Sequence, residues 1–212
     1  MARKRIKQSA KPAARPSQSQ RRDATRQRIL DATLHCLAKY GYAGTGVAQV
    51  VARAKVSRGA WAHHFPSMDA MIAEAAEYLL TQVYTQLAGV VMKVALSKDR
   101  VDALIRTAWH DFFDSDVNEI YLELLIASRR NPELSRKLRA LSGKLEGKLG
   151  DSANLFFEAA PGTAVNVAEM LHFTRWVLRG IALDAPLMPE GGVERALEVL
   201  SRFTASQVKQ KQ

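Results

Sequence analysis

One short stretch, from Thr45 to Phe65, constrains the fold of this chain more than any other. Its first half carries apolar residues at i, i+3, i+4 and i+7, the spacing of one helix face, namely Val47, Val50, Val51 and Ala54. A break follows, after which Ser57 is a good N-cap for a second short helix that Pro66 ends. The pattern predicts two short helices joined by a tight turn, with the Thr45 hydroxyl capping the first.

The second of these helices is expected to expose only small and basic residues. Its exposed positions hold Arg58, Gly59, His63 and His64. No acidic residue occurs between Asp31 and Asp69. The major groove of DNA is about 12 Å wide and admits one helix, so this composition suits it. The alternative is an ordinary helical hairpin buried in a bundle, because such spacing also arises by chance.

The positive charge of the chain is concentrated at its N-terminal end. The 212 residues carry a net charge of +10. The first 22 residues hold eight Lys and Arg and no acid, residues 23–66 have a net charge of +4, and residues 67–212 a net charge of −2. Proteins that bind a polyanion through one end have such a distribution. Residues 1–22 are expected to form a disordered basic arm, which either contacts DNA or only keeps the protein soluble.

A third helix is expected to support the helix pair. It begins near Asp23, a plausible N-cap, and Gly41 is placed to end it in a left-handed conformation. Its apolar face comprises Ile29, Ala32, Thr33, Cys36, Leu37 and Tyr40. The result is a three-helix helix-turn-helix domain over residues 23–67.

The order of residues in this region resembles the N-terminal domain of TetR-family transcriptional regulators. The matching pattern is Tyr40-Gly41-Tyr42, then Thr45-x-Val47, then Val50-Val51-x-x-Ala54-x-Val56-Ser57-x-Gly59-x-x-x-x-His64-Phe65-Pro66-Ser67. The resemblance implies a dimeric, all-helical repressor that a small molecule releases from its operator. Three positions depart from the family pattern: Lys55 replaces a common turn glycine, Ala62 an aromatic that often contacts phosphate, and Met68 a common lysine.

The pattern and the resemblance together predict the residues that bind DNA. They are Thr45, Lys55, Ser57, Arg58, Gly59, Ala60, Trp61, His63 and His64. Within this set, Trp61 and His64 are expected to hold the second helix in place, and the other residues of that helix to approach the DNA.

Residues 68–212 are expected to form a helical ligand-binding and dimerisation domain, giving an all-α protein of about nine helices. Helical spacing covers residues 68–95, 99–113, 116–129, 132–160, 163–184 and 193–208, and no strand alternation occurs. The segment 163–184 is apolar on two sides and must be covered on both. With 193–208 it is expected to form a four-helix interface in a homodimer, which suits palindromic DNA. The alternative is a central helix buried in a monomer.

Aromatic residues gather in this second part of the chain. The predicted ligand-binding residues are Tyr84, Trp109, Phe112, Phe113, Tyr121, Phe173 and Trp176, and the possible polar anchors are His110, Asp111, Glu123, His172 and Arg175. Ligand pockets are mostly apolar with a few polar groups, although the same aromatics would also suit a plain core. Because Arg175 and Arg179 lie in an apolar helix, we expect an apolar effector that carries an acid, such as an acyl derivative.

Other classes of protein are disfavoured by what the sequence lacks. It contains no nucleophile elbow, no Walker loop, no complete dinucleotide fingerprint and no Cys or His pair at zinc spacing, so neither an enzyme, a cofactor nor a metal site is expected. A non-specific nucleoid or RNA-binding protein would use the basic arm but leaves residues 68–212 without a purpose. The single cysteine, Cys36, and the lack of a ~20-residue apolar run indicate a cytoplasmic protein.

Overall fold

The computed structural model describes residues 17–94 and 97–211. Its helices and strands are α1 (Gln18–Gly44), α2 (Val47–Ala54), α3 (Arg58–His64), α4 (Met68–Val94), α5 (Arg100–Ala108), a π-helical turn (Trp109–Phe113), α6 (Asp116–Ser128), α7 (Pro132–Ala153), β1 (Phe157–Ala159), α8 (Val167–Asp184), a 3-10 turn (Ala185–Leu187), α9 (Gly192–Gln207) and β2 (Val208–Gln210). The predicted all-α fold with an N-terminal helix-turn-helix is confirmed, apart from one pair of three-residue strands.

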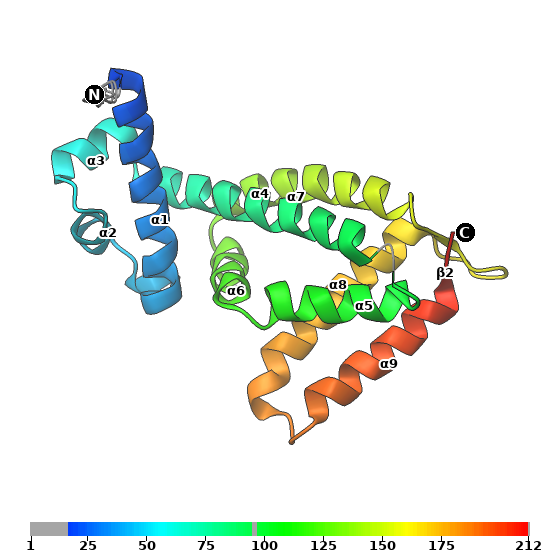
Figure 1. Ribbon diagram of the computed structural model, residues 1–212. Coiled ribbons are helices and arrows are strands. Elements are labelled where there is room, and N and C mark those ends of the chain that lie inside the picture. The colour runs from blue at the N-terminus through cyan, green and yellow to red at the C-terminus, as the bar shows by residue number, and fades with distance from the viewer. Residues whose placement is uncertain (1–16, 95–96, 212) are drawn as a thin grey trace, which may run out of the picture.

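Helices α1, α2 and α3 form one end of the molecule, and α4 leaves this end to run beside α7 (Figure 1). Helices α8 and α9 pack against each other along the opposite side, and α5 packs on α9. Among the described residues, no helix is long and apolar enough to cross a membrane.

Helix α1 begins earlier than the sequence analysis predicted. Ser17, not Asp23, is the N-cap: its hydroxyl accepts a hydrogen bond from the Gln20 N–H at 3.2 Å, and its own N–H donates to the Gln20 side chain at 2.7 Å. This reciprocal pair is a capping box. Residues 18–22, predicted to be part of a disordered arm, are therefore helical. The rest of that prediction, residues 1–16, lies outside the described residues.

Near its end, α1 is interrupted at Gly41, which has φ 66° and ψ 179°. The positive φ agrees with the prediction, but ψ is extended rather than left-handed, and the helix resumes as far as Gly44. The interruption frees the next N–H, that of Tyr42, which donates to the Glu123 carboxylate of α6 at 2.8 Å. A Cβ on Gly41 would lie 2.9 Å from the same carboxylate oxygen.

The predicted N-cap of α3 is correct, whereas the predicted N-cap of α2 is not. Thr45 does not cap α2: it is buried, its hydroxyl donates to the Gly41 carbonyl at 2.7 Å, and Gly46 is the N-cap without a side-chain bond. The hydroxyl of Ser57 caps α3 as predicted, accepting the Ala60 N–H at 3.1 Å. Lys55 occupies the turn in the left-handed conformation.

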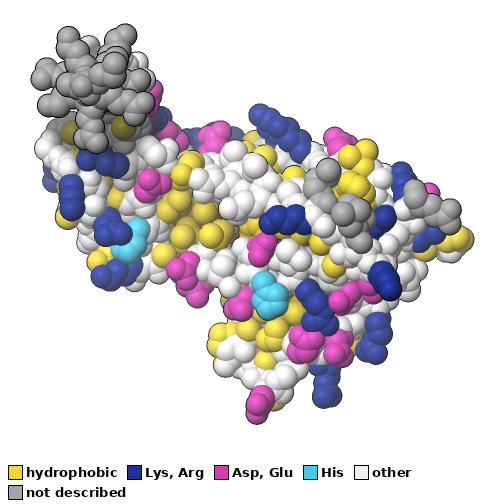
Figure 2. All heavy atoms as spheres, in the orientation of Figure 1, with side chains coloured by type: hydrophobic (Ala, Val, Ile, Leu, Met, Phe, Trp, Pro, Cys, Tyr) yellow, Lys and Arg dark blue, Asp and Glu magenta, His cyan; other side chains and the backbone are white. Residues whose placement is uncertain are grey.

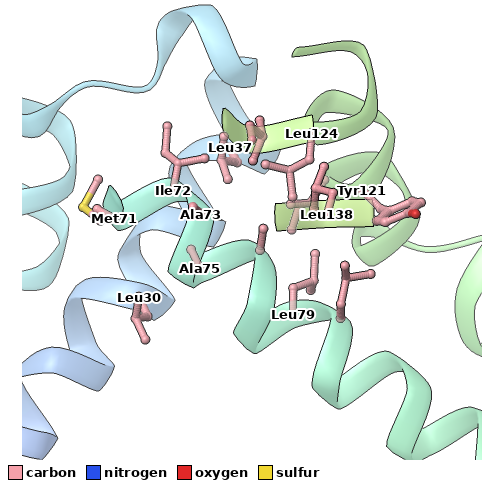
Figure 3. Close-up of a cluster of buried hydrophobic side chains, with 14 of the residues drawn as sticks. Leu30, Leu37, Met71, Ile72, Ala73, Ala75, Leu79, Tyr121, Leu124 and Leu138 are labelled. Atoms are coloured by element: carbon pink, nitrogen blue, oxygen red, sulfur yellow. The ribbon is translucent and has the colours of Figure 1, made fainter. Parts of the chain in front are cut away.

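A single apolar cluster joins the helix-turn-helix end to the rest of the protein. It includes Leu37 of α1, Met71 and Ile72 of α4, Leu124 of α6 and Leu138 of α7, all buried (Figure 3). Because α1 and α4 share this core with α6 and α7, the N-terminal helices do not form a separate packing unit.

A second apolar cluster lies between α5, the π-helical turn, α8 and α9. The helix predicted over 99–113 is present, capped by Asp99, although its last turn, from Trp109, is π-helical. The prediction of a helix over 132–160 is wrong at its end, because α7 ends at Ala153. The chain beyond it forms β1, which pairs antiparallel with β2 so that Phe157 lies opposite Gln210. This pairing joins segments about 50 residues apart in the sequence, so local spacing does not predict it.

Replacing Gly41 with Ala should destabilise the protein by about 1–3 kcal/mol, because the backbone conformation at this position is open essentially only to glycine. Gly147→Ala is the matched control: it lies in α7 with nothing within 4 Å of the added Cβ, so it should stabilise the protein by about 0.5–1 kcal/mol. Urea unfolding followed by circular dichroism measures both changes. Equal effects of the two substitutions would contradict the conformation assigned to Gly41.

Candidate nucleic-acid interface and ligand cavity

Helix α3 is held in place by Trp61 on its inner side. Trp61 is buried, and its indole N–H points at the sulfur of Met71 in α4, 3.0 Å away. Since Met71 lies in the first turn of α4, the indole connects the two helices that flank the Pro66–Ser67 link. The predicted holding role of Trp61 agrees with this position.

Arg26 of α1 holds the other end of α3. Its guanidinium forms a two-bond ion pair with Glu74 of α4, one bond measuring 2.6 Å, and donates to the His64 carbonyl at 3.2 Å. It also lies over the Phe65 ring, 4.9 Å from the centroid. One side chain thus joins α1, α3 and α4. No local sequence pattern predicts this role of Arg26, because its partner Glu74 lies 48 residues away in the chain.

The outward side of α3 carries most of the residues predicted to bind DNA. Ser57, Arg58, Gly59 and His63 are exposed, as is Lys55 in the preceding turn. Ala60 is partly buried, and Thr45 does not belong to this surface because it is buried. Lys and Arg side chains and a histidine gather at this end of the molecule (Figure 2).

His64 contributes little charge to this surface. Its Nδ1 atom is buried and has no hydrogen-bond partner among the described residues. Burial chiefly, and then nearby positive charges such as Arg22 and Arg26, lower the pKa of His64 below its ordinary value. His64 is therefore neutral at pH 7. The positive charge beside α3 comes from lysine and arginine.

An open groove between the start of α1 and α3 adds residues that the sequence analysis did not assign to the site. It is lined by Gln18, Ser19, Arg21, Arg22, Asp23, Thr25, Arg26, Ala60, His63 and His64. Its α1 side exists because the helix begins at Gln18. The sequence carries a signal for this start, the Ser17-x-x-Gln20 capping box, which the choice of Asp23 as N-cap overlooked.

Two small adjoining cavities lie inside the second part of the chain. The aromatic cavity, of about 40 Å³, is lined by Leu80, Val83, Tyr84, Leu87, Phe112, Phe113, Val117, Asn118, Tyr121, Arg175 and Arg179. The aliphatic cavity, of about 50 Å³, is lined by Leu87, Val91, Leu104, Ile105, Ala108, Phe113, Glu146, Leu149, Leu171, His172, Thr174, Arg175 and Leu178. They share Leu87, Phe113 and Arg175. Four predicted ligand residues therefore come together here: Tyr84, Phe112, Phe113 and Tyr121.

The other three predicted ligand residues do not reach these cavities. Trp109 is buried in the neighbouring core, whereas Trp176 is 60% exposed. Phe173 is 42% exposed and lines an open apolar groove between α8 and α9. A pattern of aromatics at helical spacing does not reveal which face of α8 turns inward, so the sequence could not show that Phe173 and Trp176 lie away from these cavities.

The polar anchors divide in the same way. His110 and Asp111 are exposed, and Glu123 bonds to the Tyr42 N–H instead. His172 and Arg175 do lie at the cavities, where both pair with Glu146 of α7, at 3.4 and 2.6 Å. Arg175 also donates to the Tyr84 hydroxyl at 3.3 Å. The sequence analysis missed Glu146, whose partners lie on a helix more than 20 residues further along the chain.

Arg179 lies one turn beyond Arg175 on α8 and has a different environment. Its guanidinium carbon lies 4.4 Å from the centroid of the Tyr121 ring. Its Nε atom is buried without a hydrogen-bond partner among the described residues. No acidic side chain within 17–94 and 97–211 forms an ion pair with it. The same residue ranges contain no group of three His, Cys, Asp or Glu side chains placed to hold a metal ion.

Comparison with known proteins gives consistent results. A family model described as "Bacterial regulatory proteins, tetR family" matches residues 29–75. The HTH-type transcriptional regulator CymR of Pseudomonas putida is 32% identical over 120 residues, 57% of this chain and 59% of CymR, so the match spans less than two thirds of that protein. The uncharacterized HTH-type transcriptional regulator Rv2912c of Mycobacterium tuberculosis is 32% identical over 147 residues, 69% of this chain and 72% of Rv2912c. The crystal structure of a TetR transcription regulator from Haloarcula marismortui superposes with a TM-score of 0.65 at 16% identity, covering 88% of this chain and 100% of that one.

Arg26→Met should lower the free energy of unfolding by about 1–2 kcal/mol, since it removes hydrogen bonds to a charged partner in a partly exposed pair. Arg28→Met removes the same charge from an exposed position on α1 and should change stability by less than about 0.5 kcal/mol. Chemical unfolding of the two variants beside the parent protein measures the difference. If both variants lose the same stability, Arg26 does not join α1, α3 and α4 as described.

Proposed function

The chain belongs to the TetR family of bacterial transcriptional regulators, a family of DNA-binding proteins, and from this premise we propose that it is a dimeric repressor which a small, largely apolar acid releases from a palindromic operator. In this proposal the helices up to Ser67 bind DNA, while residues 68–212 bind the effector and the second subunit. The relatives are transcriptional regulators, which agrees with the prediction that the chain is not an enzyme.

The exposed side of α3 is the observation that carries the proposal for DNA binding. It presents Arg58, Gly59 and His63, and no acidic residue occurs in the sequence from 32 to 68, so α2 and α3 themselves carry no carboxylate that would repel phosphate. Two departures from the family pattern, Ala62 and Met68, remove side chains that would contact phosphate. We propose that Arg21 and Arg22, beside α3 in the open groove, supply charge instead.

Lys55 fits the same proposal. A left-handed conformation costs a residue with a Cβ about 1–2 kcal/mol, which glycine avoids. A lysine at this exposed turn is explained if its ammonium group contributes to phosphate binding. Its position directly before the N-terminus of α3 places that charge on the side of the molecule where DNA would lie.

The dimer is supported by the apolar surface of α8 and α9. In the single chain, six large apolar side chains of these helices and the turn between them are exposed to water, namely Phe173, Trp176, Leu183, Leu187, Val199 and Phe203. The Phe173 and Phe203 rings lie 5.6 Å apart beside the open groove between the two helices. Exposed apolar patches of this kind mark protein interfaces, and a two-fold axis through them would form a four-helix contact.

Two helices offer a physical route from the cavities to α3. Helix α4 contacts Trp61 through Met71 at one end and carries Tyr84 and Leu87 of the cavities further along. Helix α6 carries Tyr121 at the aromatic cavity and Glu123 at the end of α1. An effector that displaces α4 or α6 would therefore move the DNA-binding helices, because both contacts are direct.

Selection of bound fragments from genomic DNA tests the proposed function. A TetR-type dimer is expected to enrich one site with two-fold symmetry, its half-sites separated by about one helical turn of DNA. The genes beside that site would then indicate the effector. Recovery of fragments without a common sequence would contradict a sequence-specific regulator.

Arg58→Ala should weaken binding to every DNA sequence and reduce the salt dependence of binding, with the slope of log K against log salt falling by about 0.9 for each phosphate that the variant no longer neutralises. Arg139→Ala is the control, since this exposed arginine of α7 carries the same charge on the other part of the chain and should leave the slope unchanged. Fluorescence anisotropy across a salt series gives both slopes. An unchanged slope for Arg58→Ala would show that Arg58 does not contact phosphate.

Phe203→Glu should convert the dimer into a monomer at micromolar concentration, because it places a charge in the apolar contact between α8 and α9 of the two subunits. Leu155→Glu changes an even more exposed apolar residue that lies outside these helices and should leave the dimer intact. Light scattering coupled to gel filtration gives the masses. A parent protein that is already monomeric, or a Phe203→Glu variant that remains dimeric, would contradict this interface.

A further inference from the structure

We propose that Arg179 binds the acidic group of a monoanionic effector, whose apolar part lies against Phe113 in the adjoining aliphatic cavity. This inference rests on the proposed function and assigns the chemistry of its effector site. It follows from three features of the described residues: the environment of Arg179, the ion pair that Arg175 already forms with Glu146, and the position of the aromatic side chains.

The first feature is a partly buried positive charge that has no ion-pair partner among the described residues. The Nε atom of Arg179 is buried without a hydrogen-bond partner in the described part of the chain, and the nearest interaction of its guanidinium is with the Tyr121 ring. A side chain of this kind stays charged in a protein. Burying a charge is costly unless it is paired, so a ligand anion at this place would supply what the protein lacks.

Arg175, in contrast, already has a negatively charged partner. It donates to the Glu146 carboxylate at 2.6 Å, and the same carboxylate lies 3.4 Å from His172. Both partners are largely buried, with side-chain exposures of 14% and 18%. The pair is neutral as a whole, which leaves Arg179 as the one uncompensated charge among the described residues that line the aromatic cavity. The site therefore suits a single negative charge.

The side chains that line the cavities define the rest of the ligand. Tyr84, Phe112, Phe113 and Tyr121 line the aromatic cavity together with Arg179, and the aliphatic cavity adjoins it at Leu87 and Phe113, which line both. Both cavities are far smaller than the roughly 300–1,000 Å³ of typical ligand pockets, so an effector must displace a side chain. Phe113 lies between the cavities and ends a π-helical turn, a geometry that often occurs at functional sites. We expect Phe113 to move when the ligand enters.

The first experiment needs no ligand and compares two arginines on the same helix. Arg175→Met leaves Glu146 without its closest partner and should lower the melting temperature. Arg179→Met removes a charge that has no carboxylate partner in the described structure and loses only the contact with the Tyr121 ring, so it should lower the melting temperature less than Arg175→Met does. A clear loss of stability in Arg179→Met, equal to that of Arg175→Met, would overturn the proposal, because it would mean that Arg179 is already paired.

The second experiment uses defined probes: benzoate, phenylacetate, hexanoate and octanoate, each beside its neutral amide. The acids should raise the melting temperature of the parent protein and the amides should not. Arg179→Met should weaken acid binding by ~10-fold or more, the scale of one charge-assisted hydrogen-bonded pair, and Arg179→Lys should restore part of it. Acids that bind Arg179→Met as well as the parent protein would overturn the proposal. The same conclusion follows if amides match the acids, or if no acid of the panel binds the parent protein.

DNA binding separates this inference from the proposed function. Without any probe, the parent protein should bind the operator found by fragment selection, and this result does not depend on the role of Arg179. A parent protein that binds no operator would contradict the regulator itself. A parent protein that binds its operator and ignores every acid would contradict only the role of Arg179.

Discussion

The structure depends on one apolar core that α1 and α4 share with α6 and α7 (Figure 3). A three-helix unit of some 50 residues buries too little apolar surface to be stable by a wide margin, so contact with the body contributes to its stability. The same contact prevents the two parts from moving independently. Residues such as Leu37 and Leu124 therefore hold the helix-turn-helix to the rest of the protein, and any movement of one part relative to the other would have to displace these side chains.

Polar contacts give this apolar core a defined geometry. Arg26 bonds to Glu74 and to the carbonyl of His64, and Glu123 accepts the N–H that the interruption at Gly41 leaves free. Hydrogen bonds are directional whereas apolar contacts are not, so these few bonds set the orientation of α3 relative to α4 and α6. The glycine at the interruption is part of this arrangement, since a side chain there would meet the carboxylate.

The interior of the body combines two arginines that differ in their electrostatic partners. Arg175 belongs to a neutral pair with Glu146, whereas Arg179 lies over the Tyr121 ring and has no ion-pair partner in the described structure. The two residues lie one helical turn apart on α8 and have the same chemistry in isolation. Their contrast shows that the electrostatic character of a cavity is decided by what faces it from other helices, here α7 and α6.

The sequence by itself determined the helical class, the helix pair with its Ser57 cap, and the acid-free face of α3, because periodicity, capping and local charge act within a few residues of the chain. It also contained, unrecognised, the Ser17 capping box that starts α1. Tertiary structure alone decided that Thr45 is buried, that Phe173 and Trp176 face outward, that β1 pairs with β2, and that Glu146 neutralises Arg175. Each of these outcomes joins segments that are far apart in the chain or depends on which face of a helix is covered, and only packing settles such questions.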